Sequence, residues 1–165
     1  MTARHLILVG LPGSGKTTVG RRLAELLALP LVDLDEAVEE REGLSVPALF
    51  AAHGEAWFRD AESAVLLDVL RGPTGIIATG GGAVLREENR RAMAEQGFVI
   101  FLDRSPARIC RTLDVATHPT VQNTTLEALS EKRRGLYLAC ADAVVSENDA
   151  ESAAQRCAAL WRDTL

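Results

Sequence analysis

Short apolar runs alternate with longer stretches of helical periodicity along the chain. Residues 6–9 are continuously apolar, which is typical of a strand buried on both faces. From Lys16 onward, apolar residues recur at helical spacing until Pro30 stops the pattern. Four further runs predict strands at residues 31–32 with an end at Asp33, at 76–78, at 99–102 and at 143–145.

Helix start and stop residues lie between these runs. Ser45 before Pro47 predicts an N-cap followed by a proline in the first turn, and Gly54 predicts a C-terminal stop. Thr124 with Glu127 fits a capping box for a helix that reaches residue 138. The other helical patterns cover residues 55–70, 89–96 before Gly97, 105–113 and 150–162.

Alternating strands and helices, with strands this short and apolar, predict an α/β fold. The expected architecture has three layers, with a five-stranded parallel sheet flanked by helices. The chain has 165 residues and no linker-like segment, so we expect a single domain over residues 1–165.

Composition narrows the possible partners. The net charge of −5 argues against nucleic-acid binding, which needs a basic face. The apolar run before Gly10 is too short for a signal peptide or a membrane span, so no membrane partner is expected. The three cysteines have no paired spacing and predict reduced thiols in the cytoplasm. Among the 18 basic residues only Lys16 and Lys132 are lysines.

The segment GLPGSGKT at residues 10–17 matches the phosphate-loop pattern G-x-x-x-x-G-K-[ST]. Its glycines let successive backbone N–H groups turn toward a phosphate, and the following helix directs its N-terminus there. Lys16 is expected to reach the β- and γ-phosphates of ATP, and the Thr17 hydroxyl to bind Mg²⁺. The expected nucleotide contacts are Gly13, Ser14, Gly15, Lys16, Thr17 and Thr18. No guanine-reading N-K-x-D follows, and the size suits the small-molecule kinases related to nucleoside monophosphate kinases.

Two carboxylates follow the second predicted strand. Asp33 and Asp35 are two residues apart, so a continuing strand would direct both to one side. There they could hold Mg²⁺ through water or accept a hydrogen bond from a substrate hydroxyl. The alternative is a solvated strand end.

Two more groups suggest a second substrate. Arg59 and Glu62 are three residues apart and therefore neighbours on a helix. They could form a surface ion pair worth about 0.3 kcal/mol, or Glu62 could orient the Arg59 guanidinium toward a carboxylate of the substrate. Gly80, Gly81 and Gly82 follow the third strand, where open α/β sheets bind ligands and where backbone must approach them closely.

Together these motifs resemble the shikimate kinase family. The pattern G-x-P-G-S-G-K-T-T-V-G is followed in order by D-L-D, F-R-x-x-E and G-G-G-A-V, and the resemblance covers about residues 6–145. It implies a P-loop kinase fold that transfers the γ-phosphoryl group of ATP in line to a hydroxyl of shikimate, with Mg²⁺. It also implies a substrate-binding region at about residues 34–62, a mobile lid at about 112–125 and a monomer.

The resemblance assigns roles to individual residues. Asp33 would help Thr17 to hold the metal, and Asp35 would lie nearest the nucleophilic hydroxyl. Lys16, Asp35 and Arg59 would be catalytic. Glu62 would orient Arg59, Phe50 and Phe58 would form apolar walls of the shikimate site, and Arg111 would pack on the adenine ring of ATP. Contacts to shikimate would come from Asp35, Arg59, Gly80, Gly81, Gly82 and Arg133.

The lid departs from the family pattern. The family has an Arg-Pro-Leu-type motif there, whereas this chain has His118-Pro119-Thr120-Val121, and the lid is shorter by about four residues. No Lys or Arg lies between Arg111 and Lys132. An arginine at the transferring phosphoryl group is worth about 10³–10⁵ in rate. Three interpretations are open. A partly protonated His118 substitutes for the arginine, another arginine such as Arg134 does so, or the chain uses a different acceptor or is a weak or inactive relative.

Two alternative functions stay open with shikimate phosphorylation. One is a kinase for another small hydroxy acid such as gluconate. The other is a nucleotide-binding regulatory module that has kept the fold and lost turnover, for which the cation-free lid is the motivation.

Overall fold

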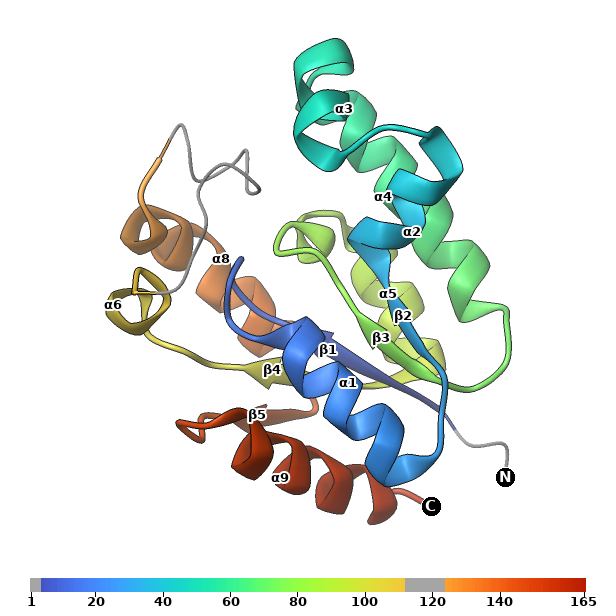
Figure 1. Cartoon of the computed structure of the whole chain (residues 1–165), viewed down its shortest axis with the longest axis vertical. Coiled ribbons are helices and arrows are strands. Elements are labelled where there is room, and N and C mark those ends of the chain that lie inside the picture. The colour runs from blue at the N-terminus through green and yellow to red at the C-terminus, as the bar shows by residue number, and fades with distance from the viewer. Residues whose placement is uncertain (1–3, 112–123) are drawn as a thin grey trace.

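A parallel sheet forms the centre of the computed structural model, which describes residues 4–111 and 124–165 (Figure 1). The order of its five strands is β2-β3-β1-β4-β5, and every neighbouring pair is parallel. The strands are β1 (His5–Val9), β2 (Leu31–Asp33), β3 (Ile76–Ala78), β4 (Gly97–Leu102) and β5 (Ala143–Val145). The predicted α/β class and all the predicted strand positions are therefore confirmed.

Helices cover both faces of this sheet, as Figure 1 shows. Their bounds are α1 (Lys16–Leu27), α2 (Leu34–Glu42), α3 (Val46–His53), α4 (Glu55–Leu70), α5 (Glu87–Gln96), α6 (Pro106–Ile109), α8 (Leu126–Cys140) and α9 (Ala150–Arg162), with a 3₁₀ turn, η1 (Ala83–Leu85). Within the described ranges, none of these helices has the length and apolar character needed to cross a membrane.

The central strand β1 shows how the two faces are filled. Leu6 and Leu8 belong to a buried cluster with side chains of α1 and α9. Ile7 and Val9 alternate with them and belong to a second cluster, with α2, α3, α4, α5 and α8. Every β1 residue is buried, which explains the continuous apolar run. Burial on both faces fixes the strand that leads into the phosphate loop.

Four predicted helix boundaries differ from the structure. Helix α6 ends at Ile109, and turn residues follow it, whereas the predicted helix reached residue 113. Helix α5 begins at Glu87 rather than at residue 89. Thr125, not Thr124, caps α8, because the Thr125 hydroxyl accepts a hydrogen bond from the Ala128 N–H at 3.1 Å. The α8 helix then continues to Cys140 rather than to residue 138. The Ser45 cap, the early proline and the Gly54 stop of α3 are confirmed.

The expectation that Asp33 and Asp35 share one side of a strand is wrong. The strand β2 ends at Asp33, whose Oδ1 accepts a hydrogen bond from the Glu36 N–H at 3.1 Å and so caps α2. Asp35 lies in the first turn of this helix. Helix α2 was not predicted, because its sequence LDEAVEERE is charged and buries only Leu34 and Val38.

Candidate active site

The phosphate loop connects the buried end of β1 to the start of α1. Gly13 and Gly15 have φ values of +78° and +96°, which side chains with a Cβ rarely adopt. Gly15 is also the residue that precedes α1, so the loop leads directly into the first turn of this helix, whose backbone N–H groups have no partner within the helix. This conformation supports the predicted cradle for an anion.

Lys16 is folded over this loop. Its Nζ donates hydrogen bonds to the carbonyl oxygens of Gly10 and Leu11, at 2.7 and 2.8 Å. Burial lowers the pKa of Lys16 to about 8, and the nearby carboxylates of Asp35 and Asp33 oppose this effect. A cation held among carbonyls within the loop is placed to exchange those acceptors for phosphate oxygens.

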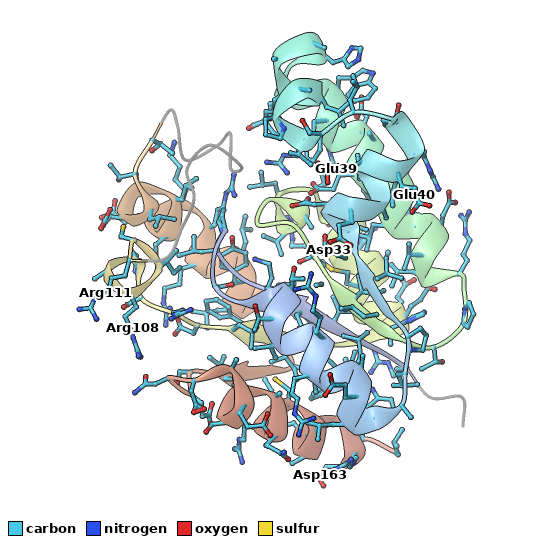
Figure 2. The ribbon with its side chains drawn as sticks, viewed as in Figure 1. Asp33, Glu39, Glu40, Arg108, Arg111 and Asp163 are labelled. Atoms are coloured by element: carbon cyan, nitrogen blue, oxygen red, sulfur yellow. The ribbon has the colours of Figure 1, made fainter. Side chains whose placement is uncertain are left out.

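Thr17 and Asp33 form the candidate magnesium site. The Thr17 hydroxyl donates a hydrogen bond to Oδ2 of Asp33 at 2.5 Å, so the two oxygens lie next to each other beside the loop. Figure 2 shows Asp33 at the end of β2, where α2 begins. No group of three or more His, Cys, Asp or Glu side chains suited to a metal exists in the described part of the chain. Mg²⁺ commonly takes one or two protein oxygens with water and substrate phosphates, so this oxygen pair fits it.

Asp35 and Glu62 converge beside Gly80. A Cβ placed on Gly80 would lie 2.9 Å from Oδ1 of Asp35 and 2.8 Å from Oε2 of Glu62. Burial raises the pKa of Asp35 to about 7, and the charges of Glu62 and Asp33 add to this effect. A side chain at this position would therefore displace one of the two carboxylates.

Arg59 is fixed by contacts on several sides. Its Nη1 donates to Oε1 of Glu62 at 2.9 Å, and the two residues are only 7% and 1% exposed. The guanidinium carbon lies 5.4 Å and 5.9 Å from the ring centres of Phe58 and Phe50. The interpretation as a surface ion pair is therefore wrong. Burial raises the pKa of Glu62 although Arg59 opposes this effect.

Arg133 reaches the same region from α8. It is 5% exposed, and its Nη1 has no hydrogen-bond partner among the described residues. Its charge acts on Lys16, Glu62 and Tyr137. Three cations of the predicted site, Lys16, Arg59 and Arg133, are thus buried close together, which favours binding of anionic ligands.

Tyr137 is a site residue that the sequence interpretation did not identify. Its hydroxyl donates a hydrogen bond to the Gly81 carbonyl at 2.6 Å, and burial raises its pKa to about 12. The available signal was the spacing of Arg133 and Tyr137, which places both on one face of a helix. Tyr137 therefore ties the glycine segment to α8.

Gly82 sets the position of Arg59. A Cβ on Gly82 would collide with the Arg59 guanidinium, although the Gly82 φ of −101° is open to other residues. Gly82→Ala is therefore expected to displace Arg59 and to lower kcat/KM for the acceptor by about 10²-fold. Steady-state kinetics with the acceptor varied measures this.

Gly135→Ala is the matched control, because a Cβ there meets nothing within 4 Å. It removes a glycine from the interior of α8 and should stabilise the protein by up to about 1 kcal/mol with unchanged kinetics. Equal kinetics for Gly82→Ala and the unmodified protein would contradict the assigned role of Gly82.

The other predicted residues lie away from this cluster or outside the described ranges. Thr18 is exposed and lines a cavity of about 260 Å³ with Ser14 and Gly15. Arg111 is exposed just after α6, and Figure 2 shows it projecting outward with Arg108. Arg134 donates to Asp103 and lies over the Phe101 ring, and its role at the transferring phosphate stays a prediction. His118 and residues 112–123 of the expected lid lie outside the described residues.

Comparison with known proteins gives one consistent family. The family model for shikimate kinase matches residues 12–161. Shikimate kinase of Xanthomonas euvesicatoria pv. vesicatoria is 40% identical over an alignment of 171 residues, which covers 97% of this chain and 95% of the relative. That of Burkholderia pseudomallei is 41% identical over 146 residues, covering 86% and 79%.

Solved structures agree with the sequence relatives. Shikimate kinase from Acinetobacter baumannii in complex with shikimate has a TM-score of 0.93 at 33% identity and covers 99% of this chain and 95% of its own. A gluconokinase from Sinorhizobium meliloti has a TM-score of 0.62 at 14% identity, covering 98% and 93%, and shares the fold alone. From its sequence and its structure, the chain belongs to the shikimate kinase family.

Proposed function

We propose that this chain phosphorylates shikimate with ATP and Mg²⁺, giving shikimate 3-phosphate, through the residues gathered around its phosphate loop. The observation that carries the assignment of the site is the buried pair of Arg59 and Glu62, which lies with Arg133 close to Lys16 and Asp35. A kinase for an acidic, hydroxylated acceptor needs these three functions together: a carboxylate clamp, a group at the hydroxyl and a phosphate cradle.

The acceptor binds by its carboxylate. Arg59 presents a guanidinium that Glu62 holds in place, and the unpartnered Nη1 of Arg133 supplies a second donor. Phe50 and Phe58, with ring centres 4.6 Å apart, form an apolar wall beside them. A fork of N–H groups matches the two oxygens of a carboxylate and thereby orients the ring.

Asp35 then lies at the reacting hydroxyl. Its carboxylate accepts the hydrogen bond of this hydroxyl and takes the proton as the new O–P bond forms and the bond to ADP breaks. Lys16 would donate to the β- and γ-phosphates, and Thr17 and Asp33, which are joined by a hydrogen bond, would hold Mg²⁺. The metal, when bound, neutralises charge that develops on the phosphate oxygens. Positioning and charge neutralisation supply most of the catalysis.

Two segments of the chain bind the acceptor and close over the substrates. Residues 34–62 form the substrate-binding region, which comprises α2, α3 and the first half of α4. The lid at about 112–125 closes over the substrates, although residues 112–123 are outside the described part of the chain. We also propose that the protein is a monomer in the cytoplasm, where its three free cysteines suit the reducing environment. Gel filtration and cell fractionation test these last two points.

An acceptor panel tests the choice of substrate. With ATP and Mg²⁺, we expect shikimate to be phosphorylated and its methyl ester to lose about 10- to 100-fold in kcat/KM, because the ester cannot form the charged contact to Arg59 and Arg133. Uncharged sugars should fail. Preferred turnover of gluconate would identify gluconate as the substrate instead, and ATP binding without transfer to any acceptor would favour the regulatory module.

A further inference from the structure

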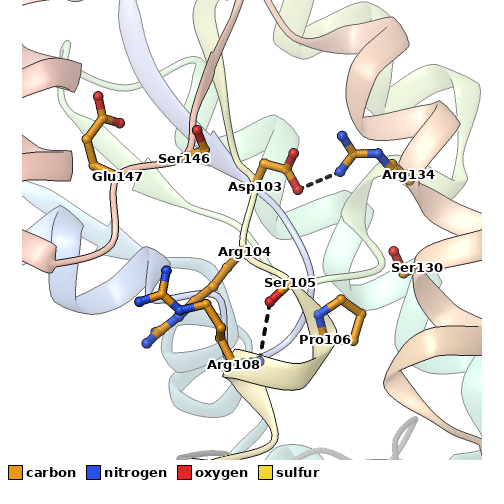
Figure 3. A pocket seen from close by; sticks show the side chains of 9 residues that line it. All are labelled: Asp103, Arg104, Ser105, Pro106, Arg108, Ser130, Arg134, Ser146 and Glu147. Atoms are coloured by element: carbon orange, nitrogen blue, oxygen red, sulfur yellow. Dashed lines mark hydrogen bonds and ion pairs between the residues drawn. The ribbon is translucent and has the colours of Figure 1, made fainter.

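A second group of arginines lies beside the phosphate loop, with Arg104 on the segment that links β4 to α6, Arg108 in α6 and Arg134 in α8. Arg104 lines two neighbouring cavities. One, of about 260 Å³, also contacts Ser14, Gly15 and Thr18 of the phosphate loop and the start of α9. The other, of about 420 Å³, is lined by Arg104, Arg108 and Arg134 together (Figure 3). Arg104 therefore faces the space next to the phosphate cradle.

Within the part of the chain that the structure describes, the Arg104 guanidinium has no anionic partner. Among residues 4–111 and 124–165, Arg104 and Arg108 form no ion pair with a carboxylate, and Arg108 instead donates to the Asn148 side chain. Nε of Arg104 is buried and has no acceptor in the described structure. A buried donor of this kind costs stability unless a ligand supplies the acceptor.

The acidic groups of these cavities do not neutralise this arginine. Asp103 accepts a hydrogen bond from Arg134, and Figure 3 shows the Arg104 and Arg108 side chains directed away from that pair. Asp149 caps α9 by accepting from the Ser152 N–H at 2.9 Å. Glu147 lines both cavities but lies outside ion-pair distance of Arg104. The space beside Ser14 and Gly15 is consequently suited to an anion.

We propose that Arg104 is a nucleotide-binding residue, which donates to the phosphate groups of ATP and ADP from the side opposite α2. This inference rests on the proposed function, since the anion it takes is the nucleotide of that reaction. Val145, Ala150 and Ala153 form apolar walls of the 260 Å³ cavity, which therefore accommodates the neutral part of the same ligand. In the sequence, residues 112–131 contain no Lys or Arg, so Arg104 supplies positive charge to the nucleotide that this segment does not.

Titration calorimetry with ADP and with adenosine tests the inference on the full-length protein. Arg104→Met is expected to weaken ADP binding by about 10- to 100-fold and to leave adenosine binding unchanged, because only ADP carries the phosphates. Arg104→Lys should recover part of the loss. In turnover, KM for ATP should rise in Arg104→Met while kcat at saturating ATP stays within about twofold. Arg91→Met, on the exposed surface of α5, is the matched control.

The outcomes separate this inference from the proposed function. Unchanged ADP binding by Arg104→Met would overturn the inference, even where the unmodified protein phosphorylates shikimate. Equal losses of ADP and adenosine affinity would also overturn it, because they indicate a general change of the cavity. Weakened ADP binding by Arg104→Met in a protein that transfers phosphate to no acceptor would support the role of Arg104 and contradict the proposed function.

Discussion

Lys16→Met is expected to lower kcat by about 10²–10³. The substitution keeps most of the apolar length of the side chain but removes the ammonium group that donates to the Gly10 and Leu11 carbonyls in the resting loop. With nucleotide bound, the same group would face the β- and γ-phosphates, where negative charge shifts during transfer. The loss therefore falls mainly on turnover, and a coupled assay of ADP release at saturating substrates measures it.

The chain provides its own control for this substitution. Lys132 is the only other lysine of the sequence, and it is exposed on α8. Lys132→Met removes the same charge and should leave kcat within about twofold, because an exposed residue without a buried partner contributes little. Similar rates for Lys16→Met and Lys132→Met would contradict the role given to the phosphate loop.

Asp35→Asn is expected to lower kcat by about 10²–10⁴, because an amide cannot take the proton of the acceptor hydroxyl. Asparagine has the size of aspartate and still accepts a hydrogen bond, so shikimate binding should change much less than kcat. Asp35 also shares its surroundings with Glu62, as their common approach to Gly80 shows. Removing one of two crowded negative charges should leave the melting temperature at least as high as that of the unmodified protein.

Glu36→Gln is the matched control for Asp35→Asn. Glu36 follows Asp35 in the first turn of α2 but is exposed. It should keep normal kinetics. An Asp35→Asn protein that unfolds at a lower temperature and loses shikimate binding together with turnover would indicate a structural role for Asp35. Retained turnover in that variant would contradict a role at the reacting hydroxyl.

The parts of the fold that follow from local pattern were predictable from the sequence. The strand β1, the phosphate loop and α1 form one continuous segment, in which buried apolar residues, glycines and a periodic helix follow each other directly. The strands β3 and β4 were predictable for a similar reason, because burial on both faces leaves a continuous apolar run. The strands β2 and β5 are only partly buried, and short apolar runs alone indicated them. Helix α2 lacks any such run, and the sequence therefore did not reveal that Asp33 caps a helix as well as accepting from Thr17.

The candidate site depends on contacts between segments that are distant in the sequence. The sequence could suggest which residues belong to the site, but it could not show which of them are in contact. The spacing of Arg59 and Glu62 is the same in an exposed pair and in a buried one, so only the packing of Phe58 and Phe50 distinguishes them. The hydrogen bond from Tyr137 to Gly81 joins residues 56 positions apart. Arg104 belongs to no motif, and it is distinguished only by the cavities that it lines.

The most direct test of the account is shikimate-dependent phosphoryl transfer by the purified protein with ATP and Mg²⁺. ADP release is followed with and without shikimate, and the product is identified by phosphorus NMR. The account predicts release of one ADP for each shikimate consumed and a phosphate ester on a ring hydroxyl, with the signal lost in Lys16→Met and kept in Lys132→Met. ADP release that shikimate does not increase, with no phosphate ester formed, would contradict it.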